Sequence, residues 1–247
     1  MSTTLSPQTL AKLQELRTQQ AAYEQRPEDK RKLANRTVLA FVGAACEGKN
    51  TLMDATVAAD RRFHVIGTVT SRAPRESDNG LPYTYYEHTD AGLETLFADI
   101  SDHKLVQYFV AKQAPFHVYG SDTEDYPGEY NVGDYFAHSI ADMRTRGFKK
   151  VIALTVITPP EVWLRRFEER FPQGHELRIY RRDEAIESFE WSLAQPTDGT
   201  HFWVENTGDP EAAAQTIVNI ALGKSKGSPK AAELCRDSLD VAKRMAA

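Results

Sequence analysis

Residues 43–51, Gly-Ala-Ala-Cys-Glu-Gly-Lys-Asn-Thr, have the types and the spacing to bind a polyphosphate. They contain the pattern G-x-x-x-x-G-K, whose glycines let backbone N–H groups turn inward around phosphate oxygens. The ammonium group of Lys49 can reach a phosphoryl group in transfer. An apolar run, 37–42, precedes the loop and a helix-compatible run follows it, so that a helix N-terminus adds its positive end. The predicted phosphate-binding loop consists of Gly43, Ala44, Ala45, Cys46, Glu47, Gly48, Lys49, Asn50 and Thr51.

The residue after Lys49 departs from the usual loop, which has Ser or Thr there because a hydroxyl group binds Mg²⁺. Asn50 stands in its place, and an amide oxygen can still ligate magnesium. Thr51 has the hydroxyl, but one residue along a helix rotates the side chain by roughly 100°. Asn50 is therefore the candidate metal ligand, and the alternative is a loop that no longer binds a triphosphate. Cys46 is expected near a helix N-terminus, where the pKa of a thiol tends to fall, which would make it sensitive to oxidation.

The alternation of apolar and helical stretches predicts an α/β fold with a parallel sheet. Strands are expected at 37–42, 64–70, 150–158 and 202–205, and helices at 161–170 and 210–222. Ser6 and Pro7 predict a helix start, and leucines at helical spacing extend this helix to about Arg26. A helical stripe from Leu234 to Met245 predicts a second helix at the other end of the chain.

Composition excludes several classes of protein. The chain has 247 residues, with 30 Lys and Arg against 35 Asp and Glu, a formal net charge of −5 that does not indicate nucleic-acid binding. Its two cysteines cannot form the framework of a small disulfide-rich domain, so a reducing, cytoplasmic location is expected. The longest apolar stretch, 151–157, is followed closely by Pro159 and Pro160, so no membrane span is expected.

Two arginines in the sequence Thr-Val-Thr-Ser-Arg-Ala-Pro-Arg, 68–75, have a spacing that suits one shared phosphate. Because Pro74 lies between Arg72 and Arg75, both are expected on an extended or turn segment, where two planar guanidinium groups can grip one dianion. Tyr83 and Tyr119 have hydroxyl groups that can donate to the same phosphate. Without further context, exposed arginines are more often solvated surface, and an isolated tyrosine more often packs in a core.

In the order of these motifs the chain resembles the guanylate kinase family. That family follows its phosphate loop with T-T-R-x-P-R, G-x-x-Y and Y-G-[ST], and the counterparts here are 68–75, the Asn-Gly-Leu-Pro-Tyr run 79–83, and 119–121. The resemblance covers about residues 37–222. It implies a P-loop NTPase fold, in which helices flank a parallel β-sheet core, with a small mixed β acceptor-binding subdomain and a helical lid.

The resemblance also implies an activity: an ATP- and Mg²⁺-dependent phosphotransferase that moves the γ-phosphoryl group to a nucleoside monophosphate or a similar small phosphorylated acceptor, with GMP as the default. By position, Lys49, Arg170 and Arg181 would be catalytic, and Asn206 would lie by the donor base. The acceptor-binding residues would be Thr68, Arg72, Arg75, Tyr83, Gln107, Tyr119, Ser121 and Asp134.

Two departures from the family bear on the acceptor. Gln107 stands where the family has a glutamate that accepts hydrogen bonds from guanine; an amide would leave one guanine donor mismatched, at a cost of roughly 1 to 3 kcal/mol if buried. Specificity for GMP is therefore open. The carboxylate pair that the family places after its next strand is represented by Asp134 alone, if the helix before that strand is shortened to the loop 122–128. A second alignment makes 135–146 that helix and loses the carboxylate.

Three parts are predicted along the chain. They are an N-terminal helical extension, 1–36; a guanylate kinase-like P-loop domain, 37–222, with an acceptor-binding part at about 68–125 and a lid at about 170–182; and a C-terminal linker and helix, 223–247. The terminal helices are expected to cover the core, with a homodimer through them as the alternative. Two other functions stay open: a ribose bisphosphate phosphokinase-like enzyme, and a catalytically inactive guanylate kinase-like module that binds a protein or a ligand.

Overall fold

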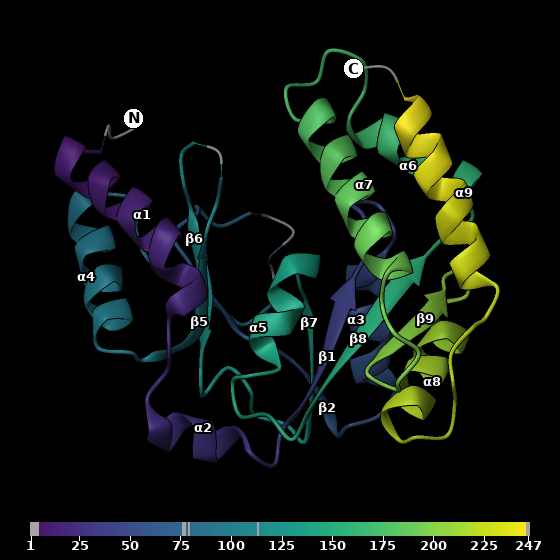
Figure 1. Ribbon diagram of the computed structural model, residues 1–247, viewed down its shortest axis with the longest axis horizontal. Coiled ribbons are helices and arrows are strands. Elements are labelled where there is room, and N and C mark those ends of the chain that lie inside the picture. The colour runs from purple at the N-terminus through teal and green to yellow at the C-terminus, as the bar shows by residue number, and fades with distance from the viewer. Residues whose placement is uncertain (1–4, 76–77, 79, 113, 246–247) are drawn as a thin grey trace. The chain divides into compact units, whose positions relative to one another are not determined.

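The computed structural model describes residues 5–75, 78, 80–112 and 114–245, which form two compact units (Figure 1). Unit 1 consists of Met1–Arg36, Val65–Gly128 and Asp142–Lys149, and unit 2 of Thr37–His64, Glu129–Ala141 and Lys150–Ala247. Each unit is thus assembled from stretches that are far apart in the sequence. Asn79, the first residue of the run 79–83, lies outside the described residues.

Unit 2 is built on a five-stranded sheet with the strand order β2-β7-β1-β8-β9. Its strands are β1 (Thr37–Val42), β2 (Phe63–Val65), β7 (Tyr130–Asp134), β8 (Lys150–Ile157) and β9 (His201–Glu205). The pairs β1–β7, β1–β8 and β8–β9 are parallel. Every residue of β1 is buried, and so is every residue of β8 after Lys150, which is typical of a parallel sheet covered on both faces.

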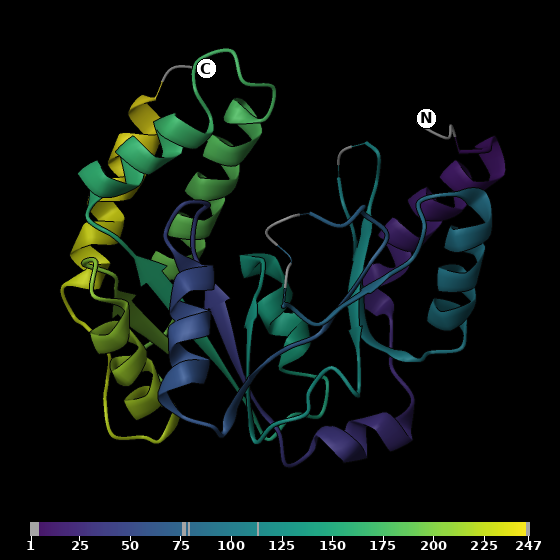
Figure 2. The ribbon, with the colours of Figure 1, turned by 180° about the vertical axis from the view of Figure 1, so that it is seen from behind.

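Helices cover this sheet. Unit 2 contains α3 (Lys49–Ala59), α6 (Pro160–Arg170), α7 (Arg178–Leu193), α8 (Pro210–Ala221) and α9 (Ala231–Arg244). Figure 2 shows α3 and α8 side by side in front of the strands, and the two helices pack against each other. α9 packs along α7 and α6, and its Cys235 is buried in one apolar cluster with Trp163, Phe167 and Phe189. Within the described ranges, no helix has the length and apolar character needed to span a membrane.

Unit 1 contains a mixed sheet with the strand order β4-β3-β6-β5. Its strands are β3 (Thr68–Thr70), β4 (Tyr83–Tyr85), β5 (Leu105–Val110) and β6 (Val118–Asp122). β3 pairs in parallel with β4 and antiparallel with β6, and β6 pairs antiparallel with β5. α1 (Pro7–Gln19) and α4 (Asp90–Ser101) lie side by side on one side of this sheet and share its apolar core (Figures 1 and 2). The predicted α/β class, with a parallel sheet flanked by helices and a second, mixed sheet, is confirmed.

The N-terminal helix ends earlier than predicted. The remaining short helical segments are η1 (Gln20–Ala22), α2 (Pro27–Leu33), η3 (Ala137–Ser139) and α5 (Ile140–Met143). The predicted end at Arg26 is wrong because Tyr23 is extended, with its ring buried and its hydroxyl donating to the carbonyl oxygen of Leu105 at 2.9 Å. Pro27 then favours an extended Arg26 and starts α2. A homodimer through the terminal helices stays a prediction.

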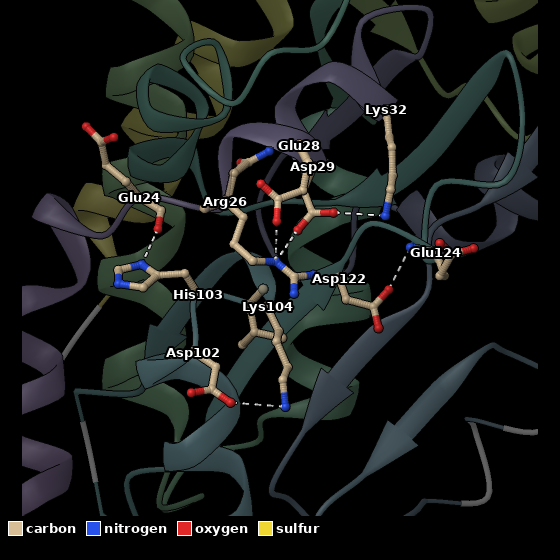
Figure 3. A network of polar contacts seen from close by, with 12 residues as sticks. Glu24, Arg26, Glu28, Asp29, Lys32, Asp102, His103, Lys104, Asp122 and Glu124 are labelled. Carbon is tan, nitrogen blue, oxygen red and sulfur yellow. Dashed lines mark hydrogen bonds and ion pairs between the residues drawn. The ribbon is translucent and has the colours of Figure 1, made fainter.

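Ion pairs hold the start of α2 in unit 1 (Figure 3). Asp29 is fully buried and accepts hydrogen bonds from Arg26 Nε at 2.7 Å and from Lys32 Nζ at 3.1 Å. Close to them, His103 Nδ1 lies 2.5 Å from the carbonyl oxygen of Glu24. Because a buried carboxylate without partners is costly, the two cations explain how Asp29 is accommodated in the first turn of the helix.

α1 is expected to be an integral part of unit 1. Its Leu13 is 0% exposed, and the carbonyl oxygen of Leu16 accepts a hydrogen bond from Tyr108 Oη at 2.9 Å. Leu13→Ala should therefore lower the free energy of unfolding by roughly 2 to 5 kcal/mol, because it removes buried apolar surface and leaves a cavity. Urea unfolding measures this loss, with Gln14→Ala on the exposed side of the helix as the control. Equal stability of the two variants would show that α1 is only loosely attached.

Candidate functional site

The loop between β1 and α3 is tightly folded against its neighbours. Gly43, Cys46 and Gly48 have positive φ values of 152°, 74° and 83°. A Cβ atom on Gly43 would lie 2.8 Å from the carbonyl oxygen of Val156, and one on Gly48 would lie 2.6 Å from Asn206 Nδ2. Both positions therefore need glycine if the loop is to pass this close to the ends of β8 and β9.

Lys49, the first residue of α3, turns back over the loop. Its Nζ donates to the carbonyl oxygens of Gly43 at 2.6 Å and Ala44 at 3.0 Å, and lies 3.7 Å from Asp134 Oδ1. The N-cap of α3 is Gly48, so no side chain at that position caps the first N–H groups of the helix. The ammonium group and these N–H groups make the start of α3 positive, which suits an anion. Asn50 and Thr51 follow in the first turn, and both are exposed.

Hydrogen bonds of Glu47 join the loop to the residues that directly follow β8 and β9. Its side chain is 0% exposed, and Oε2 accepts hydrogen bonds from the backbone N of Thr158 at 2.6 Å and from Thr158 Oγ1 at 2.7 Å. Its carbonyl oxygen accepts a hydrogen bond from Asn206 Nδ2 at 2.9 Å. Burial raises the pKa of Glu47 to about 7, against the opposing effects of the Thr158 hydrogen bonds, Lys49 and Arg166.

This buried carboxyl group is expected to make the protein less stable as the pH rises. The pKa of Glu47 is about 7 in the folded protein and has the ordinary value of 4.5 once the chain unfolds. Between these values the folded state keeps a proton that the unfolded state has released, so the free energy of unfolding falls with rising pH, by roughly 3 kcal/mol in total. Urea unfolding between pH 4.5 and pH 7 measures the slope, which Glu47→Gln should flatten. Equal slopes in the two proteins would contradict this assignment.

Cys46 has no lowered pKa. Burial raises the pKa of the thiol, and this effect outweighs the opposing effects of Arg170, which hydrogen-bonds to it, and of Lys49. The expectation of a lowered thiol pKa is therefore wrong, and the sensitivity to oxidation that rested on it loses its support. The same contact places Arg170, the last residue of α6, against the loop, with its guanidinium carbon 5.4 Å from the centroid of the Phe171 ring.

Asp134 lies close to Lys49, and Arg181 is near enough to affect its pKa. Asp134 is the last residue of β7, which pairs with β1, and about half of its side chain is exposed. The surrounding protein raises the pKa of Asp134, as does Glu184, while Lys49 and Arg181 oppose the rise. Arg181 donates to Glu184 Oε2 at 2.5 Å. A strand ends at Asp134, as the first alignment expects, and the helix that the second alignment expects at 135–146 is represented by η3 and α5; the role of Asp134 stays a prediction.

In unit 1, strand register brings five of the predicted acceptor-binding residues to one face of the mixed sheet. Thr70 lies opposite Tyr119, and Val69 opposite Gly120. Because Val69 belongs to the apolar core under α1 and α4, alternation along the strands directs Thr70 and Tyr119 to the other face. By the same alternation and the pairing of the neighbouring strands, this face carries Thr68, Tyr83, Gln107, Tyr119 and Ser121. Ser121 is 3% exposed, and its hydroxyl is engaged with Tyr126 Oη at 2.7 Å.

Arg72 and Arg75 differ sharply in their surroundings. The Arg72 side chain is 7% exposed, and its two terminal nitrogens donate to the two oxygens of Asp78 at 2.6 and 2.8 Å. Asp78 also accepts hydrogen bonds from the backbone N of Arg75 at 2.7 Å and from Tyr85 Oη at 2.8 Å. The hydrogen bonds with Arg72 lower the pKa of Asp78 far below its usual range and raise that of Arg72. Arg75 is exposed, and its side chain forms no ion pair with any residue that the structure describes.

No family model and no curated protein matches this sequence. Among solved structures, a guanylate kinase from Anaplasma phagocytophilum is similar at 15% sequence identity and a TM-score of 0.49, and the match covers 87% of this chain and 98% of that one. An unliganded sugar kinase from Janibacter sp. HTCC2649 is similar at 15% identity and a TM-score of 0.38, with 77% and 98% covered. At these values neither likeness identifies the reaction or the substrate of this chain.

Three side chains that hydrogen-bond to the predicted loop or to Arg72 were not predicted from the sequence: Thr158, Trp163 and Asp78. Trp163 is 0% exposed, and its Nε1 donates to the carbonyl oxygen of Ala45 at 3.0 Å. Thr158 and Trp163 lie more than a hundred residues from the loop in sequence, so spacing alone gives no signal for either. For Asp78 there was a signal, because an acidic residue in a turn three positions after Arg75 is well placed to pair with a nearby arginine.

Proposed function

We propose that the protein is an ATP-dependent kinase that transfers the γ-phosphoryl group to a small phosphorylated acceptor, with a nucleoside monophosphate as the default. The observation that carries the proposal is the loop 43–51, with two glycines at sites of close approach and Lys49 folded over it beside Asp134. A loop of this shape, followed at once by a helix N-terminus, suits the β- and γ-phosphates of a nucleoside triphosphate.

The residues present fit ATP and Mg²⁺. ATP supplies the phosphoryl group, and magnesium neutralises charge on its phosphates. Asn50 is the candidate protein ligand, since it is exposed in the first turn of α3. Among the described residues, no group of three or more His, Cys, Asp or Glu side chains is arranged to hold a metal ion. Such a group is not required, because Mg²⁺ in kinases is held by substrate phosphates and one or two protein oxygens.

Positive side chains of unit 2 would stabilise the phosphoryl group in transfer. Lys49 would leave the carbonyl oxygens of Gly43 and Ala44 and bind the phosphates, and Arg170 and Arg181 would add charge. Proximity of these cations to Asp134 supports a site for a highly charged ligand. Asn206 would act through the loop, since its Nδ2 is bonded to the Glu47 carbonyl oxygen.

The acceptor would bind to unit 1 through its phosphate. Arg75 is the available guanidinium group, and Tyr83 and Tyr119 share one sheet face with Gln107. Arg72 would either leave Asp78 and bind the phosphate, or stay paired with Asp78 and hold the segment that carries Arg75. Gln107 would select the acceptor by offering one acceptor group and one donor group.

Coupled ATP consumption with Mg²⁺ tests the proposal against GMP, dGMP, AMP, UMP, CMP, dTMP and ribose 1,5-bisphosphate. Turnover of one nucleoside monophosphate would support the proposal and identify what Gln107 selects. Turnover of ribose 1,5-bisphosphate alone would favour a ribose bisphosphate phosphokinase-like enzyme. No turnover, together with no ATP binding by calorimetry, would overturn the proposal in favour of an inactive binding module.

A further inference from the structure

The proposed kinase binds phosphates through the loop backbone and Lys49, which leaves the side chain of Glu47 without a role in phosphate binding. A carboxyl group is an unexpected choice in the middle of a segment that should attract a polyanion. It is also completely buried, so it does not serve solubility. The buried carboxyl group of Glu47 is therefore expected to have a structural role.

Glu47 joins the loop to two neighbouring strands at their carboxyl ends. Thr158, which donates to Glu47 Oε2 through both its backbone N and its hydroxyl group, directly follows the last residue of β8. Asn206, which donates to the Glu47 carbonyl oxygen, directly follows the last residue of β9 and is itself fixed by a bond from its backbone N to the carbonyl oxygen of Ile157 at 2.8 Å. One loop residue is thus held through both its side chain and its backbone.

The other polar contacts of the loop cannot replace this attachment. The bonds from Lys49 to Gly43 and Ala44 are lost when the ammonium group turns to a phosphate. Trp163 Nε1 donates to the carbonyl oxygen of Ala45 and Arg170 hydrogen-bonds to the Cys46 thiol, so both of these contacts hold residues that precede Glu47. The bonds of Glu47 are therefore the ones that can fix the second half of the loop before and after a donor binds.

We propose that Glu47 is a positioning residue that clamps the phosphate loop against the ends of β8 and β9 and so keeps its N–H groups in a binding arrangement. The identity of the ligand rests on the proposed function, but the clamp acts in the free protein. Its work is done by one side-chain oxygen that accepts two hydrogen bonds. A glutamine can supply the same acceptor, whereas an alanine cannot.

Hydrogen exchange of the free full-length protein tests the clamp without any ligand. In Glu47→Ala, the amides of 43–50 should exchange on the order of tenfold faster than in the wild type, while the amides of β1 keep their rates. Glu47→Gln should stay within about threefold of the wild type. Thr158→Val, which removes the hydroxyl donor and keeps the backbone donor, should be intermediate, and it serves as the test if Glu47→Ala does not fold.

The consequence for the ligand is measured by calorimetry with Mg-ATP and by steady-state kinetics. Glu47→Ala should bind ATP about tenfold more weakly and raise its KM by a similar factor, with a smaller change in kcat, and Glu47→Gln should restore both. Glu190→Gln, which removes a carboxylate from an exposed ion pair with Lys243, is the matched control for charge.

Two results would overturn the clamp: unchanged loop exchange in Glu47→Ala, or a Glu47→Gln variant as impaired as Glu47→Ala, because the negative charge and not the hydrogen bonds would then matter. Faster loop exchange in a protein that binds no ATP would support the clamp and refute the proposed function.

Discussion

Lys49→Ala is expected to reduce phosphoryl transfer on the order of a thousandfold or more, and to leave the fold intact. The reason is that phosphoryl transfer depends on positioning and on charge stabilisation, with little covalent chemistry for the protein to perform. Lys49 Nζ is the cation that both touches the loop and lies within 4 Å of a carboxylate at the end of the adjacent strand. Its loss should lower kcat far more than it raises the KM for ATP, because the charge matters most in the transition state.

Folding should be little affected, because the loop keeps its hydrogen bonds through Glu47 and Trp163 when those from Lys49 to Gly43 and Ala44 are lost. Circular dichroism and thermal unfolding check this, and coupled ATP consumption measures the turnover. Lys243→Ala is the matched control, since it removes a half-exposed lysine of the same unit that pairs with Glu190. Turnover by Lys49→Ala at the wild-type rate would rule out the loop as the donor site.

Strands β1 and β8 of unit 2 could be predicted from the sequence because they are buried on both faces. β1 and β8 are short, continuous apolar runs, a pattern typical of buried strands, and each leads into a loop and a helix. The single strand expected at 64–70 is wrong, because the structure has two short strands there, β2 and β3, in different sheets. The boundaries of the N-terminal helix were harder. Leu10, Leu13 and Leu16 indicate a helix but do not fix where it ends, and the burial of Tyr23 within unit 1, which outweighs local helix propensity, has no short-range sequence pattern.

The candidate site could be predicted in its residue types more than in its contacts. Motif spacing predicted Lys49 at the start of a helix, whereas the strand that carries Tyr119 was not predicted. The partners of these groups come from distant segments, as Thr158 does for Glu47. The position of Asp78 in a turn signals a pair with a nearby arginine but not with which one: Arg72 and Arg75 look equivalent in the sequence, yet Arg72 is buried in an ion pair and Arg75 is exposed.

The burial of the Arg72–Asp78 ion pair leads to a large expected change in stability. Asp78→Ala should destabilise the protein by roughly 3 kcal/mol, because it leaves the guanidinium group of Arg72 buried without its counter-ion. The side chains of Arg72 and Asp78 are 7% and 9% exposed, and Asp78 also loses the hydrogen bonds from Tyr85 and from the backbone of Arg75. Urea unfolding measures the change.

A matched pair shows whether burial is the cause. Asp60 and Arg62 lie at the same N–O distance of 2.6 Å as Asp78 and Arg72, but Arg62 is 44% exposed. Asp60→Ala should therefore have little effect, since a solvated ion pair contributes little to stability. Similar losses in the two variants would mean that burial does not set the value of the Asp78 pair.

The double variant Arg72→Met/Asp78→Ala distinguishes the cost of an unpaired buried charge from the loss of the ion pair itself. Removing both charges leaves no uncompensated buried ion, so the double variant should recover part of the stability that Asp78→Ala loses. Its acceptor KM then decides between the two roles open to Arg72. A KM close to that of the wild type would make Arg72 a support for the segment that carries Arg75. A KM raised by tenfold or more, in a protein of recovered stability, would mean that Arg72 releases Asp78 and binds the phosphate of the acceptor. Each tenfold rise in KM would then correspond to a loss of about 1.4 kcal/mol in binding free energy.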